Sequence, residues 1–84
     1  MGKQEQIFEH YPDDYFVFAD GYEEAIIGIQ EPSLKVVYDE DKCISILVND
    51  GMDIDDAKEY FEFNTKGSFI GDRTPIFIKR LFDK

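Results

Sequence analysis

The chain has 84 residues, 43% of them hydrophobic and 15% aromatic, and a formal net charge of -10. This composition predicts one folded domain, and the charge argues against direct binding to nucleic-acid phosphates or to an anionic membrane surface. One cysteine excludes an internal disulfide, and no apolar run is long enough for a membrane span or a signal core. We therefore expect a cytoplasmic protein.

The N-terminal stretch differs from the rest of the chain. Residues 1–14 show no clear hydrophobic period, and Pro12 interrupts them. We expect an irregular arm here, free to move. A single α+β domain should follow over residues 15–84, because no linker or low-complexity segment divides the remainder.

Two apolar runs follow the arm, and a turn signal separates them. Residues 15–19 are rich in strand formers, and Asp20-Gly21 precedes a second run over 22–29. Asp-Gly between two apolar runs is typical of a two-residue hairpin turn. The sequence therefore predicts that the two runs pair as antiparallel strands.

The second run is apolar on both of its faces. Strand periodicity would place Ala25, Ile27 and Ile29 together on one face, which predicts a strand covered on each side. A third run over 34–38 follows after a short break at 31–33. A connection this short favours antiparallel pairing.

The hydrophobic period then changes to that of helices. Asp39 is a good N-cap for a helix over 40–50, and Gly51 is placed to end it in a left-handed conformation. Asp53 can cap a second helix that ends near Gly67. Its inward stripe is Ile54, Ala57, Tyr60 and Phe61.

The last predicted element is a strand over residues 75–79, after a loop over 68–74. Proline lacks an N–H group, so Pro75 belongs at the start of this strand or at a sheet edge. The order β-β-β-α-α-β indicates the α+β class. We expect a small antiparallel sheet covered by the pair of short helices.

Catalytic and metal-binding patterns are missing from the sequence. Loops starting at Asp39 or Asp53 lack the ligands and the glycine of a calcium-binding EF-hand. Cys43 falls on the apolar stripe of the first predicted helix, where a cysteine behaves as a small core residue. His10, the one histidine, lies in the N-terminal arm. We predict a protein that is not an enzyme and that uses no metal or cofactor.

Acidic and aromatic residues are the best candidates for a binding surface. Between Gln4 and Leu34 the chain has many carboxylates and no lysine or arginine. Phe63 lies off the inward stripe of the second helix. Either the N-terminal arm or the loop at 69–70 covers it, or it anchors an interface. The candidate partner-binding residues are Glu23, Glu24, Asp55, Asp56, Glu59, Glu62 and Phe63.

The basic C-terminal end has a simpler interpretation. Lys79, Arg80 and Lys84 can pair with acidic residues of the same molecule.

Two blocks of the chain form distinctive sequences: Gly21-Tyr22-Glu23-Glu24-Ala25-Ile26-Ile27-Gly28-Ile29 and Glu59-Tyr60-Phe61-Glu62-Phe63-Asn64. Through these blocks the chain resembles small uncharacterised acidic proteins encoded by tailed bacteriophages. The resemblance covers about residues 21–78. It implies no catalytic residues. It suggests expression in the cytoplasm of a bacterial host, where small accessory phage proteins often bind host proteins.

These observations lead to one main functional hypothesis and two alternatives. The main hypothesis is a non-catalytic acidic module that binds a host protein with a basic surface. One alternative is a DNA mimic that inhibits a nucleic-acid-binding host protein, because clustered carboxylates can imitate the charge density of a duplex. The other is a self-associating structural or assembly protein that pairs through the open edge of the last strand.

Overall fold

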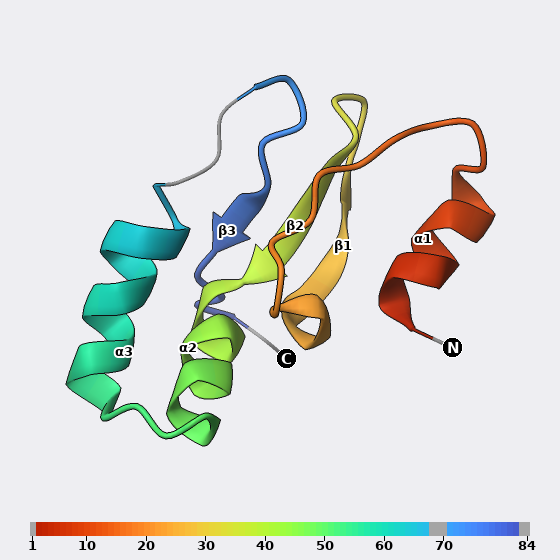
Figure 1. The fold of residues 1–84 in the computed structure, drawn as a ribbon. Helices are drawn as coiled ribbons and strands as arrows, with labels where there is room; N and C mark the ends of the chain where they lie inside the picture. The colour runs from red at the N-terminus through yellow and green to blue at the C-terminus, as the bar shows by residue number, and fades with distance from the viewer. Residues whose placement is uncertain (1, 68–70, 83–84) are drawn as a thin grey trace.

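The computed structural model describes residues 2–67 and 71–82 and has a three-stranded sheet with helices packed against it (Figure 1). This arrangement confirms the α+β class. The strands, in their order across the sheet, are β1 (Ile26–Gln30), β2 (Lys35–Asp39) and β3 (Ile76–Ile78). The helical elements are α1 (Lys3–His10), the 3₁₀ turn η1 (Glu23–Ala25), α2 (Glu40–Asn49), α3 (Ile54–Tyr60) and the π-helix η2 (Phe61–Thr65).

The sheet is mixed, so the prediction of a purely antiparallel sheet is wrong. Strands β1 and β2 run antiparallel, as expected from their short connection, whereas β2 and β3 run parallel. Parallel strands need a long crossover connection, and α2, α3 and η2 lie between β2 and β3 in the chain. The predicted helix pair is thus the crossover that makes the last strand parallel.

A β-bulge changes which side chains of β1 face the core. Ile26 pairs with Tyr38 and Gly28 with Val37, so Ile27 is an extra residue without a partner. Ile26 is buried and Ile29 packs against the core, whereas Ile27 is 41% exposed. The expectation that Ile27 and Ile29 share one face is therefore wrong. Strand β1 also lies at an edge of the sheet, with β2 as its only neighbour among the described strands.

Residues 15–19 are not a strand, and the predicted hairpin is absent. The backbone N–H of Ala19 donates instead to the buried hydroxyl of Tyr38, at 2.7 Å. Gly21 adopts a φ of 89°, so a turn does form at the predicted place. The turn leads into η1, and the segment before it passes over the sheet rather than joining it (Figure 1).

The N-terminal arm contains a helix, contrary to the prediction of irregular structure over residues 1–14. The Glu5 carboxylate accepts the backbone N–H of Gly2 at 3.0 Å, and Glu23 accepts the backbone N–H of Gln4 at 3.3 Å. Both carboxylates lie where helix α1 has free N–H groups and a positive dipole end. Ile7 is buried and fixes α1 to the core.

The two later helices begin at the predicted caps. The Asp39 carboxylate accepts the N–H of Lys42 at 3.3 Å, and that of Asp53 accepts the N–H of Asp55 at 3.1 Å. Gly51 has a φ of 113°, which confirms its role after the end of α2. Helix α3 continues as a π-helix, in which the Lys66 N–H donates to the Phe61 carbonyl at 2.8 Å.

The core lies between one face of the sheet and the helices. Val36 and Tyr38 of β2 are fully buried there, together with residues of α1, α2, α3 and η2. The ring of Phe77 connects the layers, with its centroid 5.3 Å from that of Tyr38 and 5.2 Å from that of Phe61. Ile27 and Ile78 are exposed on the edge strands.

Candidate functional site

An exposed aromatic pair stands out on the outer side of α3 and η2. Phe63 is 73% exposed and Tyr60 is 42% exposed. The expectation that Ile54 and Tyr60 point inward is therefore wrong, because only Ala57 and Phe61 of that stripe are buried. Phe63 and Tyr60 line a shallow hollow of about 400 Å³ together with Asp56 and Glu59, and Met52 and Asn64 complete it. We call the side chains of Asp56, Glu59, Tyr60 and Phe63 the α3 face.

The packing of the helix explains why Phe63 points outward. Ala57, Phe61 and Thr65 lie on the inner side and are buried. The Thr65 hydroxyl shares a hydrogen bond of 2.9 Å with the Tyr22 hydroxyl, which fixes the orientation of the π-helix. Since Phe63 lies two residues from both Phe61 and Thr65, it must face away from the core.

Two segments were expected to cover Phe63, the N-terminal arm and the loop at 69–70. The N-terminal arm does not cover it, because α1 packs near β1 and η1 instead. Residues 69–70, the other expected cover, lie outside the described residues.

The carboxylates of the α3 face are exposed and available to a partner. Within residues 2–67 and 71–82, neither Asp56 nor Glu59 forms an ion pair. Glu62 differs, because Lys66 lies 3.8 Å from it one helical turn away. Asp55 is exposed in the first turn of α3. The structure thus brings Asp56, Glu59 and Phe63 together and leaves Asp55 and Glu62 beside them.

Glu23 and Glu24 belong to another part of the molecule. Glu23 caps α1, so it has a structural role. Glu24 is exposed and lines a hollow with Asp20 and Asp50 near the end of α2. These two residues therefore do not extend the α3 face.

The basic C-terminal end pairs within the molecule, as the sequence suggests. Lys79 lies 3.4 Å from the Asp41 carboxylate, and Arg80 lies 3.2 Å from that of Asp39. Both pairs are near the surface, where each contributes at most about 1 kcal/mol. Lys84 lies outside the described residues.

The most reactive side chain of the sequence is buried. Cys43 is fully enclosed in the core, as predicted, and burial raises the pKa of its thiol to about 12. The thiol therefore stays protonated at neutral pH and is a poor nucleophile. Among the described residues, no group of three or more His, Cys, Asp or Glu side chains could hold a metal ion.

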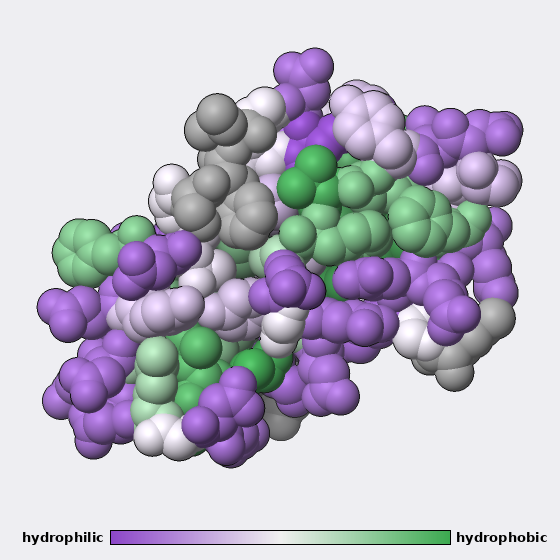
Figure 2. Space-filling model, in the orientation of Figure 1, coloured by the Kyte–Doolittle hydropathy of each residue, from purple (hydrophilic) through white to green (hydrophobic). Residues whose placement is uncertain are grey.

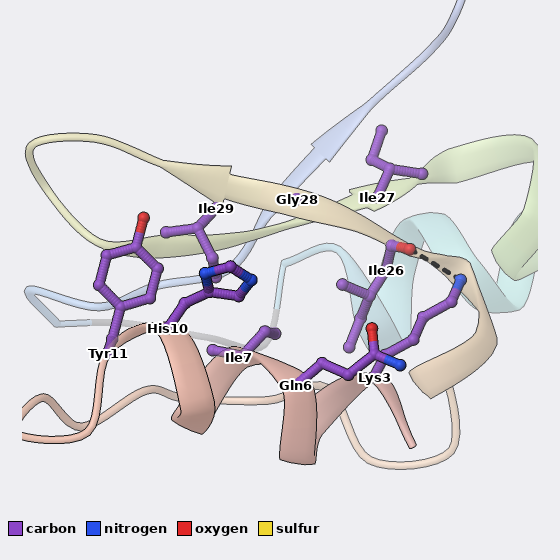
Figure 3. Close-up of a pocket in the computed structure, with 9 residues that line it drawn as sticks. All are labelled: Lys3, Gln6, Ile7, His10, Tyr11, Ile26, Ile27, Gly28 and Ile29. Carbon is purple, nitrogen blue, oxygen red and sulfur yellow. Dashed lines mark hydrogen bonds between the residues drawn. The ribbon is translucent and has the colours of Figure 1, made fainter. Parts of the chain in front are cut away.

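A second surface, which the sequence did not predict, lies between α1 and β1. Figure 3 shows a groove lined by side chains of the helix and by the strand next to it. Helix α1 forms one wall of this groove. Because the sequence analysis did not predict this helix, it could not predict the groove either. The helix formers over residues 3–6 and the spacing of Gly2 and Glu5 are the signals that could have found it.

Hydrophobic side chains gather in two areas of the face that Figure 2 shows. One area lies over the segment that joins α1 to η1, and the other over the lower ends of α2 and α3. At the adjoining ends of these helices Val48 of α2 and Ile54 of α3 are exposed, and Met52, which lies between the helices in the chain, is half-buried. Met52 also lines the hollow next to Phe63.

No protein-family model matches the chain, and no match is found among curated proteins or solved structures. None of the helices in the described residues is long and apolar enough to cross a membrane.

Proposed function

We propose that the protein is a non-catalytic binding module that docks on a partner protein through the α3 face. One observation carries this proposal: the Phe63 ring is 73% exposed between carboxylates that have no partner among the described residues. Exposed aromatic side chains of this kind supply much of the binding energy at protein interfaces. Ala57, Phe61 and Thr65 on the inner side of the same helical segment are buried, so the ring projects from a segment that is packed on the core.

The chemistry of the α3 face specifies the partner. It should offer an apolar pocket for Phe63 and lysine or arginine side chains around that pocket, opposite Asp56 and Glu59. A net charge of -10 would attract such a surface from a distance and speed the encounter. On the resemblance of its sequence to small phage proteins, we further propose a protein of a bacterial host as the partner.

The decisive experiment compares two phenylalanine variants in a quantitative pulldown from bacterial lysate. Phe63→Ala removes the proposed anchor, and Phe82→Ala is the matched control because that ring is 90% exposed elsewhere. Loss of an interface anchor costs about 2 kcal/mol or more, so we expect roughly thirtyfold weaker capture by Phe63→Ala. Equal capture of every partner by both variants would refute the α3 face as the docking site.

The charged part of the proposal needs a separate measurement. Glu59→Gln should weaken capture and make it less sensitive to salt, while Glu9→Gln on α1 should change neither. Duplex DNA added as a competitor distinguishes the alternatives. A partner displaced by DNA and retained by Phe63→Ala would favour mimicry of DNA over docking through the aromatic ring.

A further inference from the structure

The groove between α1 and β1 follows the free edge of the sheet. Its volume is about 460 Å³, and four consecutive residues of β1, Ile26 to Ile29, line it. Side chains of a strand alternate between its two faces, so a groove that touches consecutive residues follows the backbone edge. This edge has no neighbouring strand, because β1 pairs only with β2 among the described strands.

The groove is bounded at both ends by contacts between the helix and the strand. At one end the Lys3 ammonium donates to the Glu24 carbonyl at 2.8 Å and to the Ile26 carbonyl at 2.9 Å. Figure 3 shows the second of these bonds. At the other end the Tyr11 hydroxyl donates to the Glu31 carboxylate. These contacts join the helix to the strand at both ends of the groove.

The length between these contacts suits a short extended chain. From Lys3 to Tyr11 the helix rises about 12 Å. From Ile26 to Gln30 the strand extends about 13 Å. A segment of about four residues would span the groove. Its backbone could hydrogen-bond to the part of β1 beyond the carbonyl that Lys3 occupies.

The walls indicate which side chains such a segment would carry. Ile7 and Ile26 form an apolar floor, and Ile27 leaves an apolar side chain beside the edge on the other face (Figure 3). A Cβ added at Gly28 would meet nothing within 4 Å, so there is space above the strand. Small branched apolar side chains at alternate positions would fit these surfaces.

Charge defines the flanks of the segment. The ammonium of Lys3 is occupied by two carbonyls. Glu31, which accepts the Tyr11 hydroxyl, follows one end of β1, and Glu24, which lines the hollow near the end of α2, precedes the other end. Both carboxylates are exposed, in a molecule with a net charge of -10. Basic residues before and after the extended part would therefore be attracted.

We propose that an extended segment of another protein, flanked by lysine or arginine, binds in this groove and adds a strand to the sheet beside β1. Main-chain hydrogen bonds to the strand edge give the affinity. The apolar floor gives a preference for apolar side chains, and the acidic ends give a preference for basic flanking residues. The groove is separate from the α3 face, so either proposal can fail without the other.

The test uses a fluorescein-labelled probe peptide, Lys-Lys-Val-Thr-Val-Thr-Val-Lys-Lys, with fluorescence anisotropy as the readout. We expect saturable binding with a Kd below about 1 mM, and at least tenfold weaker binding of the same peptide with glutamate in place of lysine. Methylation of alternate peptide amides should abolish binding without changing the side chains. Absence of saturable binding, or equal binding of the methylated peptide, would overturn the proposal.

Two matched variants locate the site on the protein. Ile27→Lys places a positive charge beside the groove, and Ile78→Lys makes the same change at a similarly exposed residue of β3, 37% against 41%. We expect at least a tenfold loss of probe binding for Ile27→Lys and none for Ile78→Lys. Equal loss in both variants would contradict the assignment.

Amide hydrogen exchange of the intact protein completes the test. Addition of the probe should slow exchange over residues 27–30 and leave α3 unchanged. Phe63→Ala should bind the probe as the unmodified protein does, which separates this result from the fate of the α3 face. Slow exchange over 27–30 without the probe, together with a concentration-dependent dimer in sedimentation, would show that a second copy occupies the edge and would overturn the proposal.

Discussion

Replacement of Tyr38 by phenylalanine removes one hydroxyl from the centre of the core and leaves the ring in place. That hydroxyl accepts the backbone N–H of Ala19 at 2.7 Å, and both residues are almost completely buried. In the variant the Ala19 N–H has no acceptor and no access to water. An unsatisfied buried donor costs about 1–3 kcal/mol, so we expect the free energy of unfolding to fall by that amount.

Urea unfolding followed by circular dichroism would measure this loss. For a domain of this size each 1 kcal/mol lowers Tm by roughly 4–8 °C, so the thermal midpoint should also fall measurably. The amide of Ala19 should exchange faster in the variant, while the unfolding slope m stays the same. The slope matters because an unchanged value shows that the folded and unfolded states are equally compact in both proteins.

Tyr60→Phe is the matched control for this measurement. The Tyr60 ring is 42% exposed, so loss of its hydroxyl should change stability by no more than about 0.5 kcal/mol. Equal stability of the Tyr38→Phe and Tyr60→Phe variants would refute the reasoning. It would mean that something other than the Tyr38 hydroxyl fixes residues 15–19 over the sheet.

Three further outcomes are expected. Burial raises the pKa of Tyr38 from 10.0 to about 12, so its stabilising contribution is complete below pH 10 and is lost between pH 10 and 12. Because burial also raises the pKa of Cys43 and of Tyr22, the free energy of unfolding of Tyr38→Phe should fall less over this range than that of the unmodified protein, and equal falls in alkaline urea titrations would contradict this. Gly51→Ala should cost about 1 kcal/mol in urea unfolding because φ is 113° there, whereas Gly67→Ala, with no positive φ, should cost less. Lys3→Met should speed amide exchange in α1 while α2 is unaffected, because the ammonium joins the helix to two carbonyls near β1; unchanged exchange would show that Ile7 alone holds the helix.

Elements with strong local signals could be predicted from the sequence. Helices α2 and α3 begin at Asp39 and Asp53 because each carboxylate satisfies a backbone N–H at the helix start. Gly51 ends α2 because its φ of 113° is accessible to glycine at little cost. These effects act within a few residues along the chain, so one sequence is enough to identify them.

Elements that depend on distant contacts could not be predicted in the same way. Residues 15–19 have the composition of a strand, yet their backbone bonds to a hydroxyl that lies 19 positions along the chain. The bulge at Ile27 reverses the face pattern of β1, and periodicity alone cannot locate a bulge. The parallel direction of β3 could have been predicted from the sequence, because two helices between neighbouring strands form the long crossover that parallel strands need.

The two candidate surfaces differ in how far the sequence alone predicts them. The α3 face lies along one helix, so the spacing of Asp56, Glu59 and Phe63 already suggests it. The groove combines α1 with β1, which lie far apart in the sequence, and no single segment indicates it. A surface made by one helix can be predicted by periodicity, whereas a surface made by two elements requires the fold.

The exposure of Phe63 is informative because the core does not need this ring. Tyr22, Phe61, Phe77 and Tyr38 already form a continuous series of ring contacts, with centroids 5.2 to 6.3 Å apart. An exposed phenylalanine adds little to stability and increases the tendency to aggregate, and the carboxylates of Asp56 and Glu59 beside it counter that tendency. A ring that contributes so little to folding and is surrounded by solubilising charge fits the docking that we propose for the α3 face.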